Sequence, residues 1–327
     1  MTSIKMTSIK KKSFQMSTKI LTSFLLIVSI VFIGCEKGYD KSFFYPVFGQ
    51  LTFNDREIEI HDKWSFEILK DDYAKDKVRA YFRGLEIEGS DGASFRLLKD
   101  GYSVDKNTVF YCTSYRELKS LYMTKSALFK QLEWEDPEKF VVLGEGFAKG
   151  GKYAYWRNAE IIYNCDASSF KSLGGGYASD KNYGFFENVK IQNSIGKSFH
   201  LLTYTYAADE NSVFYESCQI EVANLTAFEI LTSTVSKDDK SVYHKGVAVQ
   251  GIHAPSFKCF ENSYYAVDKH YAYWNTELIQ EAHRPSFVAK AGCRFAKDKD
   301  NYFDMTKVIE PGDYNYSSAK AEYELKE

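Results

Sequence analysis

The sequence predicts an all-β protein in which tandem repeats of about 29–30 residues form an open twisted array, or solenoid. Three observations lead to this fold class. A short turn motif recurs along the chain, aromatic residues recur at constant distances from it, and aromatic residues make up 17% of the chain while prolines number only 5. Aromatic residues favour strands, so each repeat is expected to be a short antiparallel β-meander. A propeller-like closed ring of the same units is the alternative arrangement.

The turn motif is clearest in residues 177–186, Tyr-Ala-Ser-Asp-Lys-Asn-Tyr-Gly-Phe-Phe, where Asp180 is taken as position zero. Asp and Asn side chains bond the local backbone and tolerate left-handed φ, which predicts a tight turn. With a second turn about eight residues later, each unit is expected to contain three short strands. The equivalent positions are Asp76, Asp105, Gly150, Asp180, Asp209, Asp238, Asp268 and Asp298, at intervals of 29, 45, 30, 29, 29, 30 and 30 residues. All except Gly150 are predicted to form turns.

Aromatic residues keep register with these turns. Three residues before zero stand Tyr73, Tyr102, Phe147, Tyr177, Tyr206, Val235, Tyr265 and Phe295. Five residues after zero stand Tyr81, Phe110, Tyr155, Phe185, Phe214, Tyr243, Tyr273 and Phe303. Nineteen or twenty residues after zero stand Phe95, Phe170, Phe199, Phe228, Phe257 and Phe287. Because one unit is too small to bury a core alone, the unbroken register predicts a single repeat domain over residues 45–310.

Residues 1–34 are predicted to be a lipoprotein signal peptide. Five Lys precede an apolar run at residues 20–33, which is too short to span a bilayer comfortably. The run leads to a Gly-Cys pair that resembles a bacterial lipobox, in which the Cys is acylated after cleavage. Cys35 is therefore the predicted lipidation site, and residues 35–44 are the predicted lipidated Cys and tether. Three starts of translation stay open, at Met1, Met6 and Met16.

The charge of the chain weighs against a nucleic-acid ligand. The formal net charge is −2, and removing the five Lys of the signal peptide, which has no acidic residue, leaves −7. Nucleic-acid binders instead carry basic patches. An acidic chain is also not attracted to anionic headgroups, so the acyl chains alone are expected to hold it on the membrane. The expected location is the bacterial cell envelope, facing the periplasm or the cell surface.

The 45-residue interval after Asp105 contains an insertion of about 15 residues. Between residues 116 and 135, apolar residues recur at steps of three and four, which predicts an amphipathic helix. These residues are Leu118, Leu121, Tyr122, Leu128, Phe129 and Leu132. Insertions in repeat proteins often lie on the binding face, so Leu121, Tyr122 and Phe129 are candidate partner contacts. The alternative is a helix that only covers an edge of the array.

The two ends of the repeat domain are expected to be atypical. Residues 45–72 lack the turn motif and are predicted to be a degenerate capping unit, with regular units from residue 73 onward. The last unit ends at Glu-Pro-Gly, and residues 311–327 are expected to be a polar tail.

Aromatic residues six positions after zero suggest an interaction surface. Trp156 and Trp274 both stand there. If one face of each meander is open to solvent, they form a platform for an envelope protein or a glycan. The alternative is that stacking of the repeats buries both faces.

No metal or other cofactor is predicted. His253 and His283 share a phase, but a structural zinc site needs four converging ligands, and a turn position explains them more simply. Each turn offers one Asp beside a Lys, whereas calcium sites gather several carboxylates. Five cysteines follow Cys35, so at least one is unpaired, and a disulfide between Cys259 and Cys293 stays open.

The sequence contains no Gly-x-Ser-x-Gly, His-Glu-x-x-His or P-loop motif. The predicted function is therefore a non-catalytic binding or scaffold module on the envelope membrane. The alternative is an envelope enzyme with an unrecognised site, which a deep pocket with perturbed titratable groups would indicate.

The repeated pattern resembles the DKNYY family, bacterial repeat proteins named for this turn and its aromatic residues. Residues 180–183, Asp-Lys-Asn-Tyr, and residues 105–107, Asp-Lys-Asn, carry the motif best, and other units keep Asp-Lys or less. The resemblance covers roughly residues 45–310. It implies an exported bacterial protein and supplies no activity and no catalytic residues.

Overall fold

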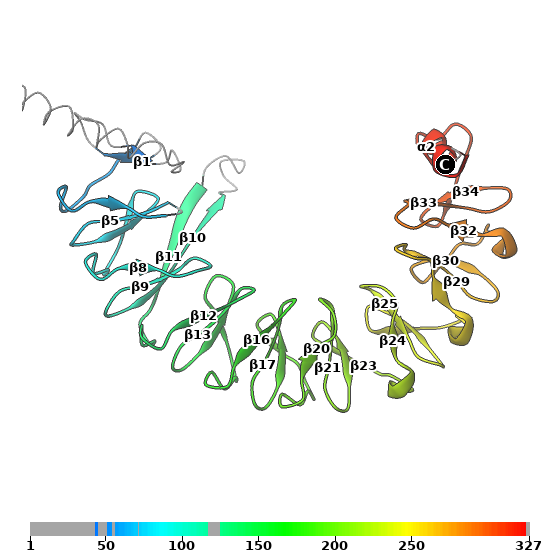
Figure 1. Ribbon diagram of the computed structural model, residues 1–327, viewed down its shortest axis with the longest axis horizontal. Coiled ribbons are helices and arrows are strands. Elements are labelled where there is room, and N and C mark those ends of the chain that lie inside the picture. The colour runs from blue at the N-terminus through cyan, green and yellow to red at the C-terminus, as the bar shows by residue number, and fades with distance from the viewer. Residues whose placement is uncertain (1–42, 45–50, 54–55, 71, 117–124, 325–327) are drawn as a thin grey trace, which may run out of the picture. The chain divides into compact units, whose positions relative to one another are not determined.

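The computed structural model describes residues 43–44, 51–53, 56–70, 72–116 and 125–324 (Figure 1). Within these ranges a three-stranded sheet is followed by eight four-stranded sheets, each antiparallel with its strands in sequence order or the reverse. The predicted all-β tandem repeat is confirmed, and the repeated sheets fit an open tandem array. The predicted signal peptide and Cys35 lie outside the described residues. The chain divides into two compact units, Met1–Ala93 and Ser94–Glu327.

The first unit holds two sheets. The three-stranded sheet consists of β1 (Phe43–Phe44), β2 (Thr52–Phe53) and β3 (Arg56–Glu57). The four-stranded sheet consists of β4 (Glu67–Ile68), β5 (Tyr73–Lys75), β6 (Ala80–Phe82) and β7 (Leu85–Ile87). Two boundaries therefore differ from the expected ones. Strand β1 lies in the segment predicted as a tether, and β4 lies in the predicted cap although it belongs to the first full sheet.

The second unit holds the other seven four-stranded sheets. The first of these consists of β8 (Arg96–Leu97), β9 (Tyr102–Val104), β10 (Val109–Arg116) and β11 (Lys125–Leu132). The second consists of β12 (Val141–Gly144), β13 (Phe147–Lys149), β14 (Ala154–Trp156) and β15 (Glu160–Ile162). The third consists of β16 (Lys171–Gly174), β17 (Tyr177–Ser179), β18 (Gly184–Phe186) and β19 (Val189–Lys190).

The last four sheets consist of β20 (His200–Leu201), β21 (Tyr206–Ala208), β22 (Val213–Tyr215) and β23 (Cys218–Ile220); β24 (Glu229–Ile230), β25 (Val235–Lys237), β26 (Val242–His244) and β27 (Val247–Val249); β28 (Lys258–Cys259), β29 (Tyr265–Val267), β30 (Ala272–Trp274) and β31 (Glu277–Leu278); and β32 (Val288–Ala289), β33 (Phe295–Lys297), β34 (Tyr302–Asp304) and β35 (Lys307–Ile309). Short 3-10 turns η2 (Leu225–Ala227), η3 (Ala254–Ser256) and η4 (Arg284–Ser286) link some of them.

Each regular unit has four strands, so the expectation of three strands is wrong. The extra strand follows the Phe column and pairs with the strand before the Asp turn, as β16 pairs with β17. Four strands fit into 29–30 residues because every described strand other than β10 and β11 has only two to four residues. The sequence signal of this strand is weak, since a pair of residues is too short to show alternation.

The core lies between successive sheets. Tyr177 and Ile191 on one sheet, Phe199 in the link, and Ala207 and Phe214 on the next sheet form one buried cluster. The Phe199 ring centroid lies 6.2 Å from that of Tyr177 and 5.6 Å from that of Phe214. The sheets β16–β19 and β20–β23 accordingly lie side by side in Figure 1. Stacking thus buries both faces of each inner sheet, as each unit alone could not.

The described part of the insertion after Asp105 consists of two paired strands, so the helix predicted over residues 116–135 is wrong for residues 116 and 125–135. Strands β10 and β11 pair over eight residues each, from Val109 opposite Leu132 to Arg116 opposite Lys125. Apolar residues four apart lie on the same face of a strand as well as of a helix, which explains the false helical signal. Of the candidate contacts, Phe129 lies in β11, whereas Leu121 and Tyr122 fall outside the described residues.

The expected polar tail contains an ordered helix, α2 (Tyr316–Glu324), so that expectation is wrong for these residues. Ala319 is fully buried against Phe295 and Ile309 of the last sheet. The Tyr323 hydroxyl donates a hydrogen bond of 2.8 Å to the Phe295 carbonyl. The helix therefore covers a face of the last described sheet. In the part of the chain that is described, no helix has the length and apolar character needed to cross a bilayer.

Candidate functional site

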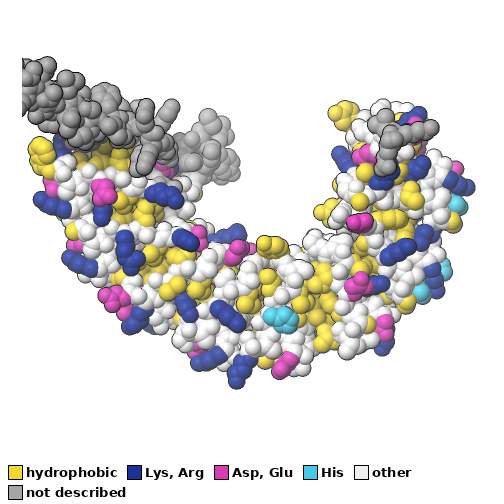
Figure 2. All heavy atoms as spheres, viewed as in Figure 1, with side chains coloured by type: hydrophobic (Ala, Val, Ile, Leu, Met, Phe, Trp, Pro, Cys, Tyr) yellow, Lys and Arg dark blue, Asp and Glu magenta, His cyan; other side chains and the backbone are white. Residues whose placement is uncertain are grey.

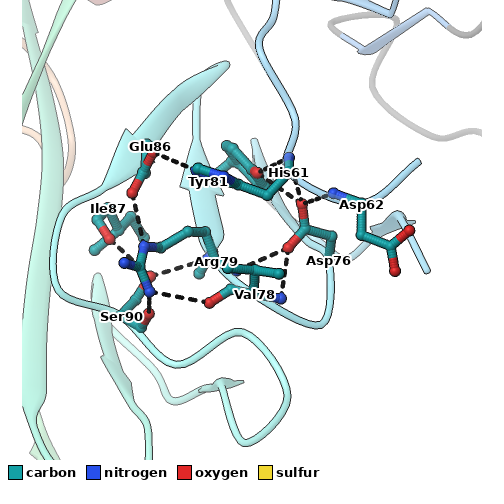
Figure 3. A network of polar contacts seen from close by, with 10 residues as sticks. His61, Asp62, Asp76, Val78, Arg79, Tyr81, Glu86, Ile87 and Ser90 are labelled. Atoms are coloured by element: carbon teal, nitrogen blue, oxygen red, sulfur yellow. Dashed lines mark hydrogen bonds and ion pairs between the residues drawn. The ribbon is translucent and has the colours of Figure 1, made fainter. Parts of the chain in front are cut away.

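A buried carboxylate organises each turn, and Asp76 shows the arrangement in full (Figure 3). Its Oδ1 accepts hydrogen bonds from the backbone amides of Val78 and Arg79 at 2.7 and 2.8 Å. Its Oδ2 accepts from the amide of His61 at 2.9 Å and from the hydroxyl of Tyr81 at 2.8 Å. One side chain thereby ties together the turn, the preceding link and strand β6.

The other turn aspartates repeat this geometry. In each, Oδ1 accepts from the amides two and three residues later, at 2.7 to 2.9 Å, as in Asp105, Asp180, Asp209, Asp238, Asp268 and Asp298. Oδ2 accepts from an amide 14 or 15 residues earlier in Asp180, Asp209, Asp238, Asp268 and Asp298. The aspartates thus lie in the turns for which the sequence predicts them.

The surroundings of these carboxylates favour the charged form. Burial alone would raise the pKa of Asp76, Asp238 and Asp268, but the backbone amides and Tyr hydroxyls that donate to them lower it overall. Burial and the hydrogen bond to the Asp raise the pKa of the donating hydroxyl of Tyr273. The Asp therefore stays ionised and the Tyr stays protonated at neutral pH.

The turn carboxylates are occupied by N–H and O–H donors, which leaves them poorly placed to bind a cation. Among the described residues, no group of three or more His, Cys, Asp and Glu side chains has metal-binding geometry. The amides of His253 and His283 donate to Asp268 and Asp298, and the two rings lie against Ser256 and Ser286. Both histidines therefore occupy link positions before a turn.

The five cysteines after Cys35 are all free thiols, so Cys259 and Cys293 are not joined. Burial raises the pKa of the Cys259 thiol to about 11, which makes it a poor nucleophile.

The predicted aromatic platform is wrong. Trp156 is only 5% exposed and packs on Phe147, with ring centroids 4.5 Å apart. Trp274 is partly buried and contacts Tyr264 at a centroid distance of 6.2 Å. Position six faces the neighbouring sheet rather than solvent, so the alternative, burial of both faces, holds. Apolar side chains on the face drawn in Figure 2 lie in separate areas among charged ones.

The hairpin β10–β11 differs from the other sheets in the length of its strands, which have eight residues each. Strand β9 pairs with β10 only as far as Tyr111, and the last bond on that side joins the Cys112 amide to Gly101. Beyond it, residues 113–116 and 125–128 pair only with each other among the described residues, and we call them the ribbon. The arrows of β10 and β11 are visibly longer than those of their neighbours in Figure 1.

One face of the ribbon exposes apolar side chains. Thr113 pairs with Leu128 and Tyr115 pairs with Ser126, so Tyr115 and Leu128 are diagonal neighbours on that face. Tyr115 is 51% exposed and Leu128 is 39% exposed. The predicted contact Phe129 is the next residue of β11, partly buried and opposite Cys112, and therefore belongs to the other face. Tyr115 is not among the predicted contacts, although the alternation of Tyr111, Thr113 and Tyr115 is a sequence signal for this face.

A shallow hollow of about 320 Å³ lies at the C-terminal end, beside the β34–β35 turn. Asp304, Lys307, Asp313 and Tyr314 line it. Asp304 is paired with Arg294, and the Asp313 carboxylate accepts from the Glu310 amide. Its two carboxylates are thus engaged in holding the local chain rather than in facing a substrate.

Short four-stranded meanders joined by carboxylate-tied turns define a class of β-repeat protein. The sequence matches the DKNYY family over residues 11–114, 51–189, 147–277 and 185–307, which together span most of the chain. The chain belongs to the DKNYY family. Searches of curated proteins and of solved structures found no match.

Proposed function

We propose that this chain is a lipoprotein of the bacterial cell envelope, anchored by Cys35, and that it acts as a non-catalytic binding module. The partner is an envelope protein that contacts the ribbon. The basic, apolar and Gly-Cys series at the N-terminus supports the anchor. The recurring aromatic side chains of the repeats pack between the sheets, which supports a binding module rather than a catalytic one.

The ribbon is the observation that carries the proposal. In the inner sheets, neighbouring sheets bury both faces and carboxylates tie the turns, and exposed apolar residues such as Tyr163 and Tyr204 lie outside the strands. The ribbon instead holds Tyr115 and Leu128 in solvent on a two-stranded support. An isolated two-stranded ribbon is marginally stable in water, and a bound protein would stabilise it by covering this face.

The test is site-specific photo-crosslinking in living cells. A photoreactive residue replaces Tyr115 or Leu128, and matched controls carry it at Tyr163 or Tyr204, which are 71% and 76% exposed on regular repeats. We expect discrete protein adducts from the two ribbon positions and not from the controls.

Equal adducts at all four positions would contradict the proposal, because exposure alone would then explain them. The absence of protein adducts at both ribbon positions would also contradict it, and would leave a glycan as the partner to examine.

A further inference from the structure

The sheet β12–β15 lacks the usual turn carboxylate, because Gly150 stands at position zero. Its turn is nevertheless held by a carboxylate. The amides of Lys152 and Tyr153 donate to Glu135 at 3.3 and 3.0 Å, and the hydroxyl of Tyr155 donates to Glu135 Oε1 at 2.8 Å. These donors are the equivalents of Val78, Arg79 and Tyr81 around Asp76.

The carboxylate of Glu135 fills the space that a side chain at position 150 would need. Glu135 is 4% exposed, and a Cβ built on Gly150 would lie 1.9 Å from its Oε2. A side chain at position 150 is therefore excluded while Glu135 is in place. Glu135 stands 15 residues before position zero, where His61, His253 and His283 donate an amide to the Asp of their own turns. In this sheet the link residue thus supplies the acceptor and the turn supplies the donors, whereas in those sheets the link residue donates to the Asp of the turn.

We infer that Glu135 is a clasp, a side chain that joins the link after β11 to the following sheet, so that the order of the β13–β14 turn depends on the position of this link. In the other turns with a full set of bonds, the carboxylate belongs to the turn, so the turn keeps its Oδ1 bonds if the preceding link moves. Here the carboxylate belongs to the link, three residues after β11 ends at Leu132.

Movement of this link removes every carboxylate bond from the turn at once. It also leaves the hydroxyl of Tyr155, a residue only 1% exposed, without its acceptor. The position of the link after β11 is thus coupled to the order of the β13–β14 turn. A force or a partner acting on the ribbon therefore reaches the β13–β14 turn through Glu135, whereas Tyr111 and Lys130 bond to Asn158 between β14 and β15.

The test is a double-mutant cycle read by amide hydrogen exchange. The variants are Glu135→Ala, Gly150→Asp and the combination of both. We expect each single variant to accelerate exchange of the Lys152 and Tyr153 amides about tenfold or more, the first by losing the acceptor and the second by the clash. In the combined variant the carboxylate introduced at position 150 can cap its turn as the other aspartates do, so exchange returns to within about threefold of wild type.

Two controls separate the clasp from general destabilisation. Glu133→Ala changes an exposed carboxylate two residues away and should leave these amides unchanged. Asp180→Gly removes a turn carboxylate from another repeat and should accelerate exchange at Asn182 and Tyr183 but not at Lys152 and Tyr153.

Two results would overturn the inference. One is unchanged exchange in Glu135→Ala. The other is a combined variant that is no better protected than the worse single variant. If a single variant fails to fold, the combined variant decides: the clasp requires that it folds and shows native protection.

Discussion

The buried aspartate of each turn joins parts of the chain that only the folded structure brings together. Asp238 accepts hydrogen bonds from its own turn through Oδ1 and from Ala223, Asn224 and Tyr243 through Oδ2. Bonds to a charged group contribute about 1.5–3 kcal/mol each. Because all of these bonds end on one carboxylate, its loss leaves several buried donors without an acceptor.

The first prediction concerns this residue. Asp238→Ala is expected to lower the unfolding free energy by about 3 kcal/mol or more, measured by urea titration of the soluble repeat domain. Asp239→Ala, next to it and exposed, is the matched control and is expected to cost less than about 0.5 kcal/mol. Equal losses in the two variants would show that the buried bonds are not what stabilises the turn.

The second prediction concerns pH. The pKa values of Asp76, Asp238 and Asp268 are lowered in the folded chain, so folding favours their ionised form. Their contribution to stability is complete above the ordinary Asp pKa of about 3.9 and is lost as the pH falls through the lowered folded values. Urea midpoints should thus change little from these groups between pH 5 and 7 and fall below about pH 4.

The matched pair for this measurement is Asp238→Asn and Asp239→Asn. The first should show a shallower loss of stability between pH 5 and 3 than wild type, because it no longer has that buried carboxylate to protonate. The second should follow wild type. A wild-type slope in Asp238→Asn would refute the assignment.

At the scale of elements, the Phe column fills the space between neighbouring sheets. Phe199 is 3% exposed and contacts rings on both sides of the interface. Phe199→Ala is expected to cost about 3 kcal/mol, the range for emptying a buried aromatic site. Leu202→Ala, at a residue that is 42% exposed, is the control and should cost less than about 1 kcal/mol. A loss below about 0.5 kcal/mol at Phe199 would contradict the core assignment.

The elements that sequence reasoning predicted correctly are those with a long-range period. The Asp turns and the aromatic columns recur many times at the same spacing, and chance does not produce such a repeated match. Their local chemistry also explains the Oδ1 bonds, which need only the turn itself. The Oδ2 bonds could not be predicted, because their donors come from a link 14 or 15 residues away that only packing brings near.

The elements that were missed occur once or are too short. The strands β20 and β24 have two residues each and show no alternation. The β11 pattern fits a strand and a helix equally at steps of four residues, and pairing with β10 decides between them. The role of Glu135 has no local signal, although Gly150 at a position otherwise held by Asp marks the place to search.

At the scale of the whole molecule, the proposed anchor makes the next prediction. Cys35→Ser should move the protein from the membrane fraction to the soluble envelope fraction, because the acyl chains are its proposed hold on the bilayer. Immunoblots of fractionated cells measure this, with Cys218→Ser, at an exposed free thiol, as the control that stays with the membrane. Full retention of Cys35→Ser in the membrane would refute the lipoprotein assignment.

A shortened ribbon provides the most direct test of the central claim, that this protein is a binding module which contacts its partner through the ribbon. Residues 114–127 are removed, Leu128→Thr removes the remaining exposed apolar side chain, and Thr113 is joined to position 128 by an Asn-Gly turn, which favours a tight hairpin and spares Glu135. After crosslinking in cells and gentle extraction, the wild-type chain is expected to migrate in a complex larger than itself. The shortened chain, still membrane-bound and folded, is expected to migrate alone. A shortened chain that keeps the wild-type complex would contradict the account.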